Sequence, residues 1–302
     1  MDGFVARGDL IPRERLRSLS ARSDRRGLTR LAGHLGALAC GATLIELARG
    51  TAWLVPALAF QGVVLIFLFA PLHETIHRTA FRARWLNDAV AWVAGMVLVL
   101  PPHYFRLFHF DHHRFTQDPA RDPELAGSKP STVRALLLYV SGWPYWREAV
   151  AGVARHARGD VTEAFIPTDE RAAIVAEARR LIACYAALVA AALALDPWTP
   201  LLHWLGPALL GQPALRFFLL AEYTGCAMVP DMLANTRTTL SNPVVRALTW
   251  NMTYHAEHHL FPGVPCHALP AVHADVRARL GVVAPGYIAF HRALWAAARR
   301  CV

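Results

Sequence analysis

The chain has few charged residues, almost no lysine and no C-x-x-C pair of cysteines. Only 18% of its 302 residues are charged, whereas about a quarter are charged in a typical soluble domain. This low charge excludes a disordered or solvating polymer and disfavours an ordinary soluble enzyme. The 31 basic residues include a single lysine, Lys129. The five cysteines form no C-x-x-C pair, so we expect reduced thiols rather than a disulfide framework or an iron–sulfur site.

Apolar residues are abundant and gathered in blocks. They make up 55% of the chain, and the mean hydropathy is +0.28. A helix that crosses a bilayer needs about 20 apolar residues, and four blocks approach this length: 31–48, 52–71, 174–195 and 201–221. Short connections within each pair predict two helical hairpins, 31–71 and 174–221. The sequence therefore predicts an all-α integral membrane protein with about four transmembrane helices.

A further apolar block, 89–100, is too short to span and ends at Pro101 and Pro102. Its length suits a re-entrant or interfacial segment. Residues 1–30 are arginine-rich and lack the apolar run of a secretory signal peptide. Because cytoplasmic segments gather arginine, we expect 1–30, 72–173 and 222–302 on the cytoplasmic side. Residues 1–302 then form one multi-pass domain with a cytoplasmic helical cap.

Histidine is frequent, with fifteen in the chain. Eight form one H-x-x-x-H and two H-x-x-H-H clusters: His73, His77, His109, His112, His113, His255, His258 and His259. Side chains three or four residues apart share a helix face, so each cluster directs its imidazoles to one point. The predicted topology brings the three clusters to the same side of the membrane. Eight imidazoles are too many for one four-coordinate zinc and suit two metal ions, and imidazole binds zinc, iron, copper or nickel.

Other classes of protein fit parts of this pattern. Residues 73–77 also match H-E-x-x-H, in which two histidines bind zinc and the glutamate is the base of a metalloprotease. A membrane zinc metalloprotease leaves six clustered histidines unexplained. A non-enzymatic metal-binding membrane protein would carry ligands along its spans, whereas these clusters lie beyond them. The net charge of +9 also fits a nucleic-acid binder, but the arginines flank apolar blocks, so we expect no nucleic-acid partner.

The three clusters and their spacing resemble the histidine boxes of the membrane fatty acid desaturase and hydroxylase superfamily. The stretch 251–262, NMTYHAEHHLFP, extends the resemblance beyond the histidines. Residues 235–239 and 264–270 are similar to a bacterial subgroup that includes dihydrorhizobitoxine desaturase-like proteins. The resemblance runs from the first predicted span to about Leu280.

This resemblance implies a chemistry. Members of the superfamily use two iron ions and O2 to take hydrogen from an aliphatic C–H bond, which gives an alkene or an alcohol. The expected substrate is a fatty acyl chain or membrane lipid, and a small amino-acid-like metabolite is the alternative. The sequence contains no fused electron-transfer motif, so electrons are expected from an external ferredoxin, rubredoxin or reductase. The likeness to bacterial proteins implies an inner-membrane location.

The resemblance also gives roles to residues around the boxes. Carboxylates within them are expected to accept the outer ring N–H of ligand histidines, which fixes the tautomer: Glu74, Asp111 and Glu257. Glu222 and Asp231 lie near the end of a predicted span, where a charge is costly and is expected to be paired or functional. Polar residues that follow are candidate substrate contacts, although they equally fit a helix cap: Asn235, Thr236 and Arg237.

Tyr223 departs from the pattern of the superfamily. Members often carry a further histidine in a Glu-His pair before the third box, and here that pair reads Glu222-Tyr223. Tyr223 and Asp231 are candidates, like Asn251 and Glu222, for an additional metal ligand or for a contact to a ligand. Two interpretations of the site follow. Either Asn251, Glu222 or a water completes the site beside the eight histidines, or one iron is bound more weakly.

Overall fold

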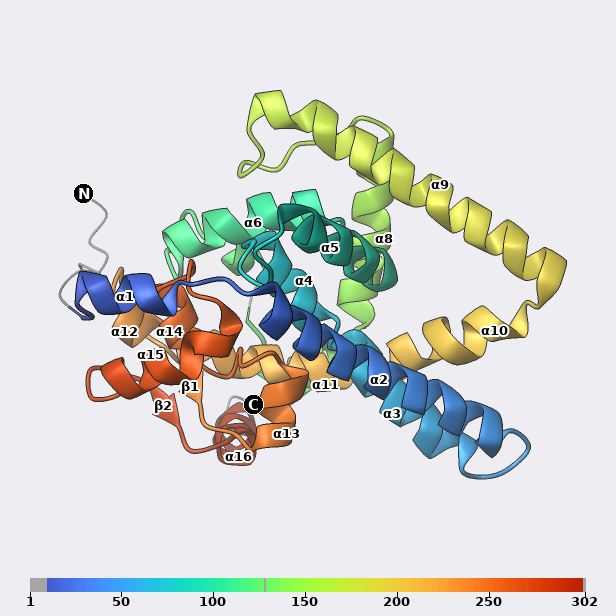
Figure 1. Ribbon diagram of the computed structural model, residues 1–302. Helices are drawn as coiled ribbons and strands as arrows, with labels where there is room; N and C mark the ends of the chain where they lie inside the picture. The colour runs from blue at the N-terminus through green and yellow to red at the C-terminus, as the bar shows by residue number, and fades with distance from the viewer. Residues whose placement is uncertain (1–9, 128, 301–302) are drawn as a thin grey trace.

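The structure is a computed structural model that describes residues 10–127 and 129–300. Helices dominate these residues, and their strands are one parallel pair in which Thr238 is in register with Val283 (Figure 1). The all-α prediction is therefore confirmed. The prediction for the N-terminal segment falls partly on residues 1–9, which lie outside the described residues.

Elements follow one another along the chain in a simple order. The α-helices are α1 (Arg13–Leu19), α2 (Asp24–Ala48), α3 (Leu54–Ile66), α4 (Phe69–Ile76), α5 (Arg84–Leu98), α6 (Pro102–Phe115), α7 (Val133–Val140), α8 (Trp143–Ala157), α9 (Arg171–Leu195), α10 (Trp198–Pro200), α11 (Gly206–Tyr223), α12 (Met232–Asn235), α13 (Pro243–Leu248), α14 (His255–Leu260), α15 (Leu269–Val276) and α16 (Tyr287–Ala298). The remaining elements are the 3-10 helices Pro123–Leu125, Thr168–Glu170 and Cys266–Ala268, the π-helix Leu201–Leu205, and strands β1 (Thr238–Thr239) and β2 (Val283–Ala284).

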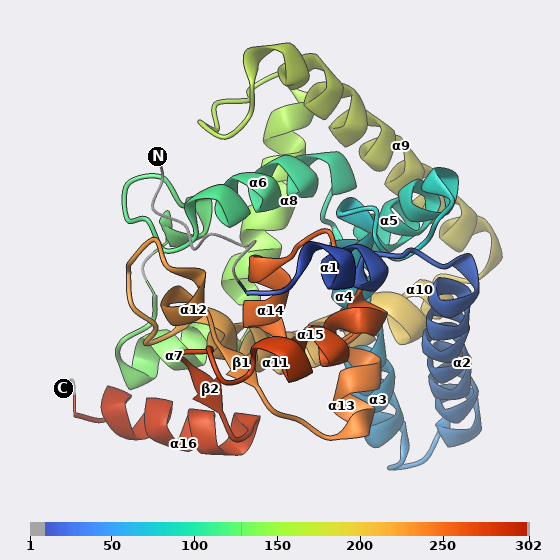
Figure 2. The same cartoon turned by 60° about the vertical axis from the view of Figure 1, so that its left-hand side comes forward.

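The first predicted hairpin is present. Segments Asp24–Ala48 and Leu54–Ile76 are long and apolar enough to cross a membrane, and α2 lies beside α3 in both views (Figures 1 and 2). Helix α2 begins earlier than the predicted residue 31, because Ser23 caps it by accepting a hydrogen bond from the backbone N–H of Arg26. The second segment continues into α4, which places the first histidine box at its end.

Helices α5 and α6 form a sharply bent pair. Their axes differ by 96° at the break around the two prolines, the geometry of a broken span or a re-entrant loop. The last carbonyls of α5 accept hydrogen bonds from the Tyr145 hydroxyl (2.7 Å), the Tyr185 hydroxyl (2.6 Å) and the Trp204 indole (2.9 Å). These bonds satisfy backbone groups that a helix end leaves open. The bend turns α6, with the second histidine box, toward α4.

The second predicted hairpin needs correction. Thr168–Leu195 is long and apolar enough to span, but 201–221 is not among the candidate spans of the described residues. That segment forms a π-helix and α11, in which Gln212, Arg216 and Glu222 lower the hydropathy. Helices α9 and α11 diverge from their connection instead of pairing (Figures 1 and 2). Within the part of the chain that the structure describes, three helical segments are therefore long and apolar enough to cross a membrane, and the fourth candidate is the bent pair α5–α6.

Helix α11 packs against α3 through glycines. A Cβ on Gly211 would collide with the backbone of Gly62, and a Cβ on Gly62 would collide with the backbone of Pro207. Small residues permit this close approach of two backbones. The contact fixes α11 against the first hairpin and so determines where Tyr223, at its C-terminal end, can lie.

The C-terminal residues form a cap of short elements around α14 (Figure 2). All six residues of α14 are buried. The backbone N–H of Thr239 in β1 donates to the carbonyl of Thr253, just before α14, at 2.9 Å. Trp250 and Leu260 share one apolar core with Phe67 from the first hairpin. The third histidine box is therefore held rigidly against the helices that carry the other two.

Candidate metal centre

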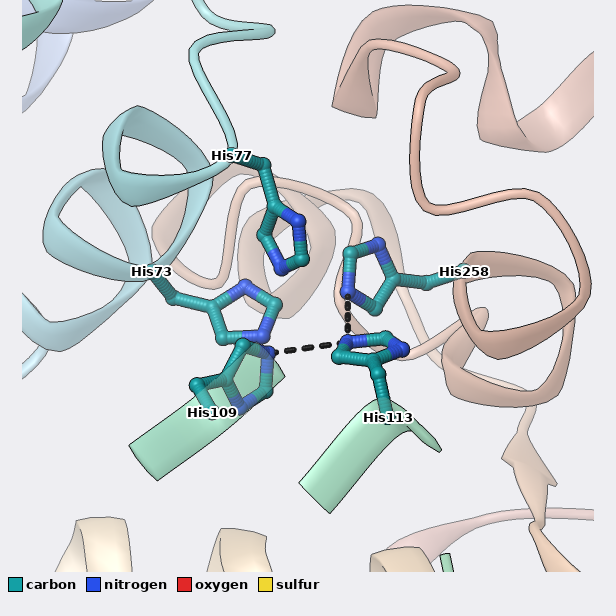
Figure 3. A group of neighbouring side chains, drawn as sticks. All are labelled: His73, His77, His109, His113 and His258. Carbon is teal, nitrogen blue, oxygen red and sulfur yellow. Dashed lines mark hydrogen bonds between the residues drawn. The ribbon is translucent and has the colours of Figure 1, made fainter. Parts of the chain in front are cut away.

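Five histidines from three helices meet at one point. We call them the five-histidine group: His73, His77, His109, His113 and His258. Their ligand nitrogens all lie within 4.8 Å of one another, and all but His77 are buried (Figure 3). The first two come from the end of α4, the next two lie four residues apart on one face of α6, and the last comes from α14. Helical spacing thus predicts the pairs, and the fold brings the pairs together.

The ring nitrogens of this group face one another (Figure 3). Nε2 of His113 lies 2.9 Å from Nε2 of His109 and 3.1 Å from Nε2 of His258. Nε2 of His77 is buried without a hydrogen-bond partner among the described residues. Burial lowers the pKa of His258 well below its ordinary value, so this imidazole is neutral. Neutral imidazoles whose lone pairs crowd together in this way fit a bound metal cation.

The other three box histidines surround a tyrosine. The tyrosine-centred group consists of His112, His255, His259 and Tyr223. The Tyr223 hydroxyl oxygen lies 2.7 Å from Nε2 of His112 and 2.7 Å from Nε2 of His259. Nε2 of His255 makes a third close contact with the same oxygen. All four side chains are buried. The structure thus divides the eight histidines into five and three.

Polar side chains hydrogen-bond to the outer nitrogens of His112 and His259, whereas the outer nitrogen of His255 has no hydrogen-bond partner among the described residues. Asp122 Oδ1 lies 2.8 Å from Nδ1 of His112, and Thr116 Oγ1 lies 3.2 Å from Nδ1 of His259. Glu222 Oε1 lies 3.3 Å from Nδ1 of His255. A carboxylate on the outer nitrogen fixes the tautomer and leaves Nε2 free to bind a metal. Sequence reasoning anticipated Glu222 near this site but missed Asp122, whose only signal is an Asp-Pro pair shortly after the second box.

The carboxylates within the boxes do not contact the outer nitrogens as expected. Glu74 Oε1 accepts a hydrogen bond from the backbone N–H of Cys266 at 2.9 Å. Glu257 accepts hydrogen bonds from Thr238 and, at 2.5 Å, from Nδ1 of His273. Both are fully buried, and they tie the first box to the cap and α14 to its neighbours. Asp111 is partly exposed on α6.

The remaining predicted residues mainly hold the backbone. The Asn251 amide nitrogen donates to the Cys266 carbonyl at 2.8 Å, with a backbone φ of 64°. Asp231 caps α12 by accepting from the N–H of Leu233. Neither contact involves a box histidine, and the role of Asn251 as an additional ligand stays a prediction.

Residues 235–237 also contact backbone rather than the cavity described below. The Asn235 amide nitrogen donates to carbonyls of Thr116 (3.1 Å) and Val229 (2.9 Å). The Thr236 hydroxyl donates to the Met232 carbonyl. Arg237 donates to the carbonyls of Ala221 (2.7 Å) and Thr224 (2.8 Å), which caps the end of α11 beside Tyr223. The sequence left two interpretations open for this segment, a substrate contact or a helix cap, and Arg237 makes a helix cap.

A cavity of about 770 Å³ reaches the metal centre. Its wall includes both groups, since His73 and His109 line it together with His255 and Tyr223. Most of the remaining wall is apolar and aromatic, and its side chains include Phe67, Phe69, Leu100, Phe105, Phe108 and Met252. Charged side chains also line it: Glu124, Lys129, Glu148, Arg216 and Glu222. Such a mixture of apolar walls and a few placed polar groups is typical of ligand cavities.

Similarity to known proteins distinguishes a desaturase or hydroxylase from a metalloprotease or a non-enzymatic metal-binding protein. The model of the fatty acid desaturase family matches residues 50–291. The chain belongs to this family. An sn-1 oleoyl-lipid 12-desaturase of Picosynechococcus sp. is 25% identical over 256 residues, which cover 76% of this chain and 70% of that protein. A sphingolipid delta(4)-desaturase/C4-monooxygenase of Mus musculus is 27% identical over 244 residues, covering 75% of this chain and 67% of that protein.

Family membership confirms the principal prediction from the sequence. The chain is a membrane oxidoreductase of the lipid desaturase and hydroxylase type, in an iron-dependent family, and its histidine cluster can bind metal. The metalloprotease interpretation loses its support, because His73 and His77 meet three histidines from other helices. The likeness to the bacterial dihydrorhizobitoxine desaturase-like subgroup stays a prediction.

Proposed function

We propose that this chain is an O2-dependent di-iron enzyme that desaturates or hydroxylates an aliphatic C–H bond of a fatty acyl or lipid substrate. The observation that carries the proposal is the apolar cavity whose wall contains histidines of both groups. An acyl chain placed there brings its carbons next to the metal centre. Two iron ions suit the division of the histidines, with one ion held by the five-histidine group and the other by the tyrosine-centred group.

Each part of the site has a task in this proposal. The reduced irons and O2 supply the oxidant that takes hydrogen from an unactivated C–H bond. Asp122 keeps the proton of His112 on Nδ1, so that Nε2 faces the centre. Phe105 and Phe108 form apolar wall that excludes water and orients the acyl chain. The choice between an alkene and an alcohol then depends on which hydrogen atoms the wall presents.

A lipid substrate is favoured over a small polar metabolite. A small polar substrate needs polar groups near the metal centre, and the candidates in 235–237 bond to backbone carbonyls instead. The cavity wall is largely apolar, as a hydrocarbon chain requires. The charged residues of the wall, among them Lys129 and Arg216, then face the polar end of the lipid.

The active site is proposed to lie on the cytoplasmic side of a bacterial inner membrane. The arginine-rich N-terminal region contacts the cap directly, since Arg15 forms an ion pair with Asp275 at 3.0 Å. Arg30 also donates to the carbonyl of Arg246 at 3.1 Å. Arginine-rich segments favour the cytoplasmic side, and these contacts place the third box beside one. An external ferredoxin, rubredoxin or reductase would deliver electrons there.

An assay with defined lipid tests the proposal. The purified full chain is placed in bilayers that contain oleoyl lipid, with O2, a ferredoxin, its reductase and NADPH. Mass spectrometry of the released fatty acids is expected to show loss of two hydrogens or gain of one oxygen, and neither change in the His109→Ala variant. Oxidation that is equal in both proteins would contradict a role for the histidine groups. Iron-loaded protein that leaves lipids unchanged but oxidises amino acids would favour the metabolite alternative.

A further inference from the structure

We propose that Tyr223 is itself a metal ligand, whose phenolate oxygen completes the tyrosine-centred site with His112, His255 and His259. The inference rests on the proposed function for the presence of a second iron. It goes beyond that function because it assigns this iron an oxygen ligand from the protein.

The tautomers of two histidines are set by their outer contacts. Asp122 accepts the Nδ1–H of His112 at 2.8 Å, so Nε2 of this ring carries a lone pair whenever the ring is neutral, as a metal ligand must be. The Thr116 hydroxyl donates its proton to the backbone carbonyl of His112 at 2.7 Å. Its oxygen is therefore left to accept the Nδ1–H of His259 at 3.2 Å. Nε2 of His259 then carries a lone pair as well.

Both lone pairs point at one hydroxyl group that has a single proton. The Tyr223 oxygen is 2.7 Å from each of these nitrogens, and His255 places a third nitrogen against it. A hydroxyl donates one hydrogen bond only. With His112 and His259 both neutral, at least one nitrogen lone pair faces an oxygen lone pair in a buried place. A cation among these atoms turns the repulsion into coordination by three nitrogens and one oxygen.

The surroundings supply the charge that such a site needs. Glu124 Oε2 lies 3.4 Å from Nε2 of His112, on the metal-facing side of this ring. With the phenolate it provides two negative charges for one cation. Lys129 Nζ lies 5.5 Å from the centre of the Tyr223 ring and places a positive charge beside it. As the metal binds, an oxygen–metal bond replaces the O–H bond of the phenol, and the proton leaves to solvent.

Ferric phenolates have a spectroscopic signature that imidazole sites lack. The full chain is loaded with ferrous iron without oxygen and then oxidised in air. The wild type is expected to show a visible phenolate-to-iron charge-transfer band and resonance-enhanced tyrosine ring vibrations. Tyr223→Phe should lose both signals. Tyr139→Phe, which changes another tyrosine of the same cavity wall, should keep both.

The variant Tyr223→His distinguishes a tyrosine that binds the metal from one that only occupies the site and blocks it. If Tyr223 is a ligand, this variant binds as much iron as the wild type but has no band. If the tyrosine instead fills the site and blocks the metal, the wild type binds less iron than Tyr223→His and shows no band, which overturns the inference. A wild type that oxidises lipid without any band overturns the inference alone. A wild type that binds no iron and leaves lipid unchanged overturns the proposed function as well.

Discussion

The two halves of the metal centre are built in different ways. The five-histidine group consists of imidazoles at helical spacing, and the outer nitrogens of His73, His113 and His258 have no hydrogen-bond partner among the described residues. In the tyrosine-centred group, side chains hydrogen-bond to the outer nitrogens of His112 and His259, Glu222 lies 3.3 Å from the outer nitrogen of His255 without a hydrogen bond, and an oxygen lies in the middle. Helical periodicity makes the two histidine pairs of the first half, and tertiary packing brings them together with His258. The second half also depends on loop contacts that hold the rings of His112 and His259.

The largest effect is expected when a ligand of the five-histidine group is removed. His258→Ala should lose the iron of that group and at least about a hundredfold of activity, because even outer contacts of metal ligands contribute 10–100-fold. Iron content and lipid oxidation measure the two losses. His203→Ala is the matched control, since this histidine bonds to Glu46 outside both groups. Retained activity in His258→Ala would remove the five-histidine group from the mechanism.

A change outside the ligands should separate the two halves. Asp122→Asn cannot hold the His112 ring as a carboxylate does, so iron in the tyrosine-centred group should bind about 10–100-fold more weakly. Titration with a competing chelator measures this affinity. Iron in the five-histidine group should be unchanged. Asp118→Asn, in the same loop but paired with Arg121, should alter neither, and equal weakening of both groups by Asp122→Asn would contradict the division.

The packing of α11 should matter for stability. Gly211→Ala places a methyl group against the backbone of Gly62, and overpacking of this kind costs about 1–3 kcal/mol in the free energy of unfolding. A lower melting temperature and weaker iron binding at the tyrosine-centred group are expected, because α11 carries Tyr223. Gly33→Ala, where a Cβ meets nothing within 4 Å, should leave both unchanged or raise stability slightly. An unchanged melting temperature in Gly211→Ala would show that the helices separate easily.

The smallest effect is expected at a carboxylate that belongs to neither histidine group. Burial alone would raise the pKa of Glu163, but hydrogen bonds from Arg155 and His156 outweigh it and lower the pKa to about 2. The stabilisation from this carboxylate is present above its ordinary pKa, near 4.5, and is lost as the pH falls toward 2. The melting temperature of Glu163→Gln should therefore depend less on pH over this range than that of the wild type. The difference corresponds to less than about 1 kcal/mol in unfolding free energy. A change in the iron affinity of either histidine group would show that Glu163, Arg155 and His156 are coupled to the metal centre.

Much of the centre could be predicted from the sequence, because local periodicity determines it. The spacing of His109 and His113 places both on one helix face, and the structure keeps them there. The departure at Tyr223 was visible as a tyrosine after Glu222. Its place among three imidazoles was not, because it depends on how closely α11 packs against α3.

Other features follow from tertiary contacts that leave no periodic signal. Asp122 reaches His112 from a loop, so spacing along a helix could not reveal it. Glu74 and Glu257 lie within the boxes but face the cap, because a buried carboxylate takes the nearest donors. Arg237 caps α11, and a sequence pattern does not distinguish such a cap from a substrate contact.

Iron content tests the central claim most directly. The purified full chain, His258→Ala and His259→Ala are loaded with ferrous iron under identical conditions, and the iron per chain is measured by mass spectrometry. His258→Ala lacks one ligand of the five-histidine group, and His259→Ala lacks one ligand of the tyrosine-centred group. The account predicts about two irons in the wild type and about one in each variant. A single metal ion in the wild type that persists in His259→Ala would contradict it, because the tyrosine-centred group would then hold no metal.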